Sequence, residues 1–265
     1  MDTGVRAHSS QSDALAGCAI VITRPAGTGA SLARRIRALG AIPVMLPGLS
    51  LRPALDPVLA REQWRKAQHD DVLVFTSPAA VRYALALHAC HTRATVIATG
   101  QGTASALRRH GIQAQVPSLR QDSEGILALS SLQPLQGRRV ALVTAPEGRG
   151  LLQQQLAERG ASLREVHVYR RGPPRLDRRH VQTVSALPER TCVLLSSAQA
   201  MKNLMERLPA TAWRRLCRAD AIASSERIAA LADEMGFSRR RVAASAGPDD
   251  LLAAACESLS NDPAD

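Results

Sequence analysis

The sequence predicts an α/β protein of two doubly wound parallel-sheet domains, the first interrupted by the second. Three observations carry this prediction. Short apolar runs typical of buried strands alternate with helical patterns, which favours parallel sheets covered by helices. The same succession of runs recurs at a shift of 120 residues. With 265 residues, the chain also exceeds the usual size of one domain.

The first strand–helix–strand unit lies near the start of the chain. Residues 18–23 (CAIVIT) form an apolar run that Arg24 and Pro25 end. Apolar residues then recur at helical spacing over residues 32–39, and Gly40 favours a helix end. Residues 42–46 predict a second strand, which completes a β-α-β unit.

The repeat indicates a duplicated domain in permuted order. A shift of 120 residues superimposes residues 20–23 on 140–143 and residues 72–77 on 192–197. Such a period is far longer than that of a solenoid. The first domain is therefore expected at residues 17–47 and 174–257, and the second at residues 54–165.

Two proline-bounded linkers, residues 47–53 and 165–175, are expected to pair as a two-stranded ladder, with Gly48 and Gly172 as candidate hinge points. The tails, residues 1–16 and 258–265, are expected to be disordered.

The charge suits a polyanionic partner. There are 34 basic and 23 acidic residues, a net charge of +11, and all basic residues except Lys66 and Lys202 are arginine. Guanidinium groups bind carboxylates and phosphates in bidentate fashion, although arginines on helix faces are usually only solvated. Aromatic residues make up 2% of the chain, too few for the stacking surfaces of single-stranded nucleic-acid binders. We expect no nucleic-acid partner.

The cysteines and histidines predict neither disulfides nor a metal site. The five cysteines are widely spaced, as in a reduced cytoplasmic protein. Of the histidines only His88 and His91 have a metal-like spacing, without a third ligand. No apolar run is long enough to span a bilayer, so no membrane association is expected.

Hydroxyl and glycine residues follow the predicted strands, where ligands of doubly wound sheets bind. Several of these loops also open helices, whose free N–H groups donate hydrogen bonds to anions. Capping alone also explains residues such as Ser77 before Pro78, and one N-terminus serves both purposes. The glycine patterns match neither a dinucleotide fingerprint nor a phosphate loop. The candidate binding residues are Arg24, Thr76, Ser77, Thr103, Gly148, Arg149, Ser196, Ser197 and Ser225.

Eight short segments follow one another in a fixed order along the chain. They are ITRPAG (22–27), VFTSPAAV (74–81), GTASAL (102–107), SEGILAL (123–129), EGRGLLQQQLAERGA (147–161), VYRR (168–171), SERIAALADEMGF (225–237) and PDDLLAA (248–254). Together these segments resemble the uroporphyrinogen-III synthase family. The resemblance covers nearly the whole chain and implies two flavodoxin-like domains joined by a two-stranded linker.

The resemblance implies an enzyme that dehydrates the linear tetrapyrrole hydroxymethylbilane, inverts its ring D through a spiro intermediate and closes the macrocycle. No cofactor is implied. Because the substrate cyclises unaided to the uninverted isomer, the enzyme would act mainly by orienting ring D. A monomer is expected.

The resemblance also implies residue roles. Tyr169 matches a tyrosine that assists departure of the substrate hydroxyl, as hydrogen-bonded acid or orienter; the alternative is an aromatic residue packed at a linker. Thr103 matches a substrate-facing threonine, and Ser77 and Ser197 match helix-opening hydroxyls. Two segments depart from the family pattern: Thr144-Ala145 stands where many relatives have Arg-Gly, and residues 224–227 (SSER) replace a Gly-Pro-Thr-Thr loop.

The main expectation has two alternatives from other functional classes. A non-catalytic two-lobed binding protein for a small polyanion has the same fold and charge. A nucleic-acid-binding regulator is supported by the net charge alone, and it would bind duplex DNA with strong salt dependence.

Overall fold

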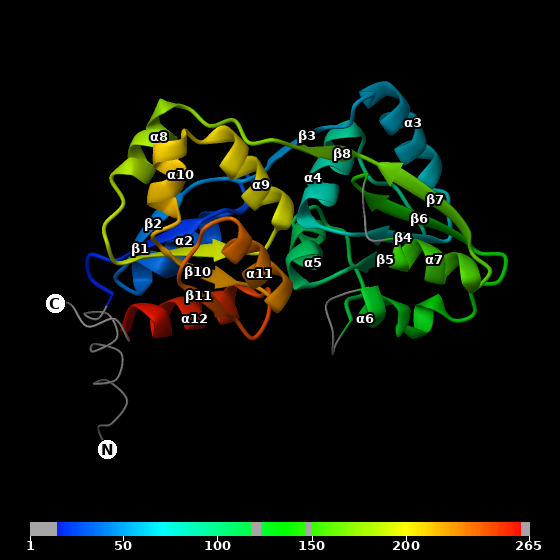
Figure 1. Ribbon diagram of the computed structural model, residues 1–265. Coiled ribbons are helices and arrows are strands. Elements are labelled where there is room, and N and C mark those ends of the chain that lie inside the picture. The colour runs from blue at the N-terminus through cyan, green and yellow to red at the C-terminus, as the bar shows by residue number, and fades with distance from the viewer. Residues whose placement is uncertain (1–14, 118–122, 147–149, 261–265) are drawn as a thin grey trace, which may run out of the picture. The chain divides into compact units, whose positions relative to one another are not determined.

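The computed structural model describes residues 15–117, 123–146 and 150–260. The chain divides into two compact units: unit 1 contains residues 1–50 and 172–265, and unit 2 contains residues 51–171. The first unit is thus discontinuous in sequence. Each unit has its own sheet, with helices on both faces (Figure 1).

Unit 1 has a parallel sheet in the order β11-β10-β9-β1-β2. Counted along the chain this is the order 2-1-3-4-5 of flavodoxin-like folds. The strands are β1 (Ala19–Ile22), β2 (Ile42–Met45), β9 (Thr191–Leu195), β10 (Asp220–Ala223) and β11 (Arg240–Val242). The helices are α2 (Ala30–Ala38), α8 (Arg178–Ser185), α9 (Ala198–Arg207), α10 (Ala210–Leu216), α11 (Glu226–Glu234) and α12 (Pro248–Ser260).

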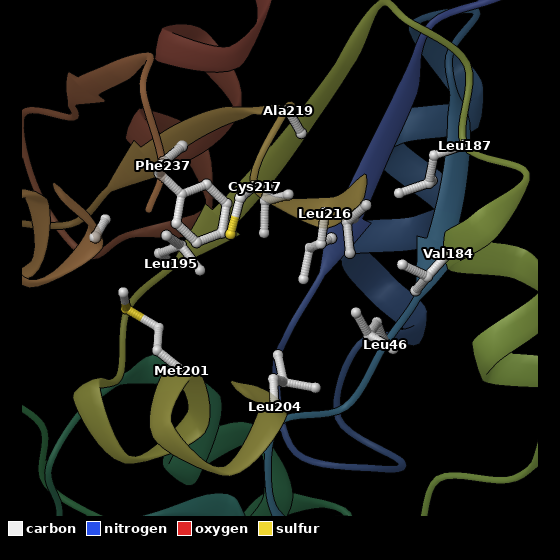
Figure 2. Close-up of a cluster of buried hydrophobic side chains, with 14 of the residues drawn as sticks. Leu46, Val184, Leu187, Leu195, Met201, Leu204, Leu216, Cys217, Ala219 and Phe237 are labelled. Carbon is white, nitrogen blue, oxygen red and sulfur yellow. The ribbon is translucent and has the colours of Figure 1, made fainter. Parts of the chain in front are cut away.

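Both faces of the unit 1 sheet are buried, which explains its continuous apolar strands. Side chains alternate between the two faces of the sheet. Ala19 and Val21 belong to the core between the sheet and helices α8, α9, α10 and α11. Ile20 and Ile22 belong to the core between the sheet and helices α2 and α12. Figure 2 shows the first of these cores, with Met201 and Leu204 of α9 pointing into it. In Figure 1, α12 lies across the sheet from α8 and α10.

Unit 2 repeats this sheet from a different starting strand. Its parallel order is β5-β4-β6-β7, and a parallel bridge between Ile97 and Gln115 extends it beyond β5. The strands β6, β7, β4 and β5 therefore occupy the places of β1, β2, β9 and β10. The strands are β4 (Val72–Phe75), β5 (Thr95–Ala98), β6 (Arg139–Thr144) and β7 (Ser162–His167). The helices are α3 (Pro57–Ala67), α4 (Pro78–Leu87), α5 (Gln101–Arg108), α6 (Ser123–Leu127), the 3₁₀ turn η1 (Ser130–Leu132) and α7 (Leu151–Glu158).

The two linkers pair as a two-stranded sheet of β3 (Ser50–Pro53) and β8 (Tyr169–Gly172). The linker expected at residues 165–175 starts later in the structure than the sequence predicted. Residues 165–167 belong to β7, where Val166 pairs with Val143 and is fully buried. The burial of Val166 in the core of unit 2 is why this stretch stays in the larger sheet.

Residues 15–16 and 258–260, which were expected in the disordered tails, belong to the described part of the chain. Leu15 is only 2% exposed and packs into the core of unit 1. Helix α12 continues to Ser260 because Leu259 extends its buried face, and the Ser258 hydroxyl donates to Asp220 over 2.6 Å. Residues 1–14 and 261–265 lie outside the described chain.

Gly48 is held firmly within unit 1. Its N–H donates to the carbonyl of Thr23 over 3.0 Å, and its own carbonyl accepts from the buried Asn203 side chain over 2.9 Å. A Cβ on Gly48 would lie 2.5 Å from the Cβ of Ala200. These contacts argue against the proposed hinge at Gly48.

Candidate active site

The predicted residues of unit 2 gather where its strand order reverses. The chain runs from β4 to β5 on one side and from β6 to β7 on the other, so the carboxyl ends of β4 and β6 form the switch point. Thr76 follows β4 and Thr144 ends β6. The Thr76 hydroxyl lies 3.0 Å from the Thr144 hydroxyl and 3.2 Å from the carbonyl oxygen of Val143. Both hydroxyls thus lie where a doubly wound sheet binds its ligand.

Ser77 and Tyr169 are in contact at the same edge. The Ser77 Oγ caps α4 by accepting from the N–H of Ala80 over 3.1 Å, and it lies 3.2 Å from the Tyr169 hydroxyl. The Tyr169 ring is 3% exposed and stacks on Tyr83, with ring centroids 5.5 Å apart. When Ser77 donates in this pair, the phenol hydrogen of Tyr169 is free to donate to a ligand.

Thr103 lies in the first turn of α5 and is 3% exposed. Its hydroxyl lies 3.5 Å from that of Thr99, which follows β5. The N-cap of α5 is Gly100, which has no side chain to cap the helix. The helix opens at the carboxyl edge of the sheet, so its first N–H groups suit an anion.

Unit 1 has an equivalent switch point between β1 and β9. Arg24 follows β1, and Ser196 and Ser197 follow β9. Ser197 caps α9 by accepting from the N–H of Ala200 over 3.3 Å, as Ser77 caps α4. The duplicated serines Ser77 and Ser197 therefore have the same structural role. Ser196, which precedes Ser197, has an exposed side chain.

Arg24 is half-buried, and burial lowers the pKa of its guanidinium group. Within the described part of the chain, this guanidinium makes no hydrogen bond or ion pair. Desolvation disfavours the charged form, and a carboxylate ligand would offset this cost. Arg24 is thus suited to hold an acidic group.

The remaining predicted residues are less informative. Ser225 is the N-cap of α11, but its side chain makes no capping hydrogen bond, so its half-buried hydroxyl is not committed to the helix. Gly148 and Arg149 lie outside the described residues.

Two cavities open at opposite edges of the unit 2 sheet. One, of about 440 Å³, is lined by Tyr169, Arg170, Arg171 and His167 together with Leu55 and Leu59. Ser77 is not among the residues that line it. A larger cavity of about 1070 Å³ lies at the amino ends of β4 and β5, around Asp70 and Arg93. It contains none of the predicted residues.

The family model for uroporphyrinogen-III synthase HemD matches residues 30–253. The chain belongs to the uroporphyrinogen-III synthase family. The uroporphyrinogen-III synthase of Escherichia coli strain K12 is 30% identical over 246 residues, which cover 89% of this chain and 98% of that protein.

Solved structures from this family share the fold. Uroporphyrinogen-III synthetase from Helicobacter pylori matches with a TM-score of 0.59 at 17% identity, over 91% of this chain and 99% of that one. A mutant uroporphyrinogen III synthase from Thermus thermophilus matches with a TM-score of 0.56 at 19% identity, over 92% of this chain and all of that one.

The described residues of this uroporphyrinogen-III synthase family member contain neither a membrane-spanning helix nor a metal cluster. None of the helices described is long and apolar enough to cross a membrane. In the same part of the chain, no three histidine, cysteine or acidic side chains are grouped to hold a metal ion.

Two residues at the site of this family member were not predicted from the sequence. Thr144 was noted only as a departure from the family pattern, yet its hydroxyl contacts Thr76. Tyr83 was not singled out, although it is the other of the chain's two tyrosines and lies six residues after Ser77. Its rarity was the available signal.

Proposed function

We propose that the chain is a uroporphyrinogen-III synthase, which cyclises hydroxymethylbilane with inversion of ring D and loss of water. The observation that carries this proposal is family membership over residues 30–253. The Escherichia coli relative bearing that name aligns over 89% of this chain. The geometry supports the roles proposed below for individual residues.

Tyr169 is proposed to assist departure of the substrate hydroxyl. Loss of hydroxide needs a proton donor. The Tyr169 hydroxyl lies 3.2 Å from the Ser77 hydroxyl, and when Ser77 is the donor of this pair the phenol can donate its own hydrogen to the leaving oxygen. The buried, stacked ring holds this donor in one place, which favours orientation over strong acid catalysis.

The carboxylates of the substrate are proposed to bind at the helix N-termini of both units. Ser77 and Ser197 open α4 and α9, and Thr76 and Ser196 directly precede these two serines. Thr103 lies in the first turn of α5, Ser225 is the N-cap of α11, and Arg24 offers a half-buried guanidinium. Gly148 and Arg149 remain binding residues proposed from the sequence. The net charge of +11 attracts an acidic substrate to these sites.

The proposal includes a reaction without a cofactor, carried out by a monomer in the cytoplasm, with no nucleic-acid partner. Tyr169, Arg24 and the helix N-termini supply the donors that departure of hydroxide and carboxylate binding require.

The test is to add the purified chain to freshly generated hydroxymethylbilane and to separate the uroporphyrin isomers after oxidation. We expect isomer III, whereas buffer alone gives isomer I by unaided closure. If the chain binds the substrate but only isomer I forms, the protein is the non-catalytic polyanion-binding alternative and the proposal is wrong.

A further inference from the structure

Helix α4 contacts Tyr169 at two points. At its start, the N-cap Ser77 lies 3.2 Å from the Tyr169 hydroxyl. Further along, the ring of Tyr83 is stacked on the Tyr169 ring, with centroids 5.5 Å apart and planes inclined by 12°. This distance is typical of an offset stacked pair. One helix therefore holds both the polar end and the ring of the same side chain.

Tyr83 also contacts the other strand of the two-stranded sheet. Its hydroxyl donates to the carbonyl oxygen of Leu51 in β3 over 2.8 Å. Since Tyr169 begins β8, which pairs with β3, Tyr83 contacts both strands. The guanidinium carbon of Arg82 lies 4.7 Å from the Tyr83 ring centroid, on a ring that is half-buried.

These contacts restrict the torsion angles of Tyr169. The phenol oxygen lies on the axis of the second side-chain bond, so rotation about the first bond decides its position. Because the oxygen is at the far end of the side chain, a small rotation about the first bond displaces it more than it displaces the ring atoms. The stack opposes rotation of the ring, whereas the Ser77 contact restrains only the hydroxyl. A displacement of about 1 Å at a catalytic group is enough to reduce turnover strongly.

We propose that Tyr83 is a positioning residue, which fixes the Tyr169 ring by stacking and anchors it to β3 through Leu51. This inference rests on the proposed function. Tyr83 acts through the Tyr169 hydroxyl, and its ring rather than its own hydroxyl carries most of the effect.

The first test compares Tyr83→Leu with Tyr83→Phe. The leucine variant removes the stack and the Leu51 hydrogen bond, and we expect kcat to fall about tenfold with little change in KM. The fraction of isomer I also rises, because released or slowly processed substrate closes unaided. The phenylalanine variant keeps the stack and retains a kcat near that of the wild type.

The second test is a double-mutant cycle with Tyr169→Phe. If Tyr83 acts through the Tyr169 hydroxyl, adding Tyr83→Leu to Tyr169→Phe causes no further loss of kcat. A merely structural role predicts that the two losses multiply, and that result would overturn the inference. Tyr83→Met gives the same comparison if Tyr83→Leu does not fold.

Trp213→Leu is the matched control in unit 1. Trp213 is also half-buried, pairs with Phe237 at 5.7 Å between ring centroids, and donates to the carbonyl of Met235 over 3.3 Å. Its loss is expected to lower thermal stability but not kcat. If the wild type forms isomer III and Tyr83→Leu has the same kcat, the inference about Tyr83 is wrong and the proposed function stands. If the wild type yields only isomer I, the proposed function is wrong instead.

Discussion

At the scale of single residues, Tyr169 is both a core side chain and a candidate catalyst. Its ring belongs to the apolar cluster that includes Phe75 and Val166, while its hydroxyl contacts Ser77. The linker-packing interpretation and the catalytic interpretation of the sequence therefore describe two ends of one side chain. A substitution that removes only the hydroxyl separates them.

Tyr169→Phe is expected to lower kcat severalfold or more while leaving the fold intact. The ring still stacks on Tyr83, and the Ser77 hydroxyl still caps α4, so few contacts are lost. Steady-state kinetics with isomer analysis, together with a thermal unfolding curve, make the measurement. Unchanged turnover would remove Tyr169 from the mechanism.

At the scale of elements, equivalent helices α4 and α9 begin with equivalent serines. Ser77 and Ser197 each cap their helix through the residue three positions later, Ala80 or Ala200. A cap satisfies one of the free N–H groups, and the others remain available for an anion. Capping and carboxylate binding are thus compatible at one N-terminus. A capping residue with a negative charge distinguishes the two roles, because it still caps the helix but repels a carboxylate.

Ser197→Asp tests carboxylate binding at α9. Aspartate caps helices as well as serine does, so stability should hold, but its negative charge should repel substrate carboxylates and raise KM several-fold. Ser197→Ala should instead cost about 1 kcal/mol of unfolding free energy.

Asp177→Ser, at the N-cap of α8 in the same unit, is the control and should leave KM unchanged. A KM for Ser197→Asp equal to that of the wild type would exclude substrate from this helix end.

At the scale of the whole molecule, the permuted repeat was visible in the sequence because both sheets are buried on both faces. Strands buried on both faces, such as residues 72–75 and 192–195, are apolar at every position, so the apolar run is recognisable in both copies of the duplicated domain. The end of β7 could not be read in the same way, because Val166 and Val168 alternate equally well in either sheet. The stack of Tyr83 on Tyr169 joins residues far apart in sequence, which no local pattern encodes.

One buried and one partly buried thiol predict how stability depends on pH. Burial raises the pKa of Cys90 in unit 2 and of Cys217 in unit 1 to about 11, from an ordinary value of 9.0. Between these values the folded chain keeps protons that the unfolded chain releases, so the free energy of unfolding falls as pH rises. The contribution is complete below pH 9 and is lost as pH passes 11. Urea unfolding between pH 8 and 11 should therefore show a shallower decline for the Cys90→Ala/Cys217→Ala variant than for the wild type, and equal slopes would contradict the burial of these thiols.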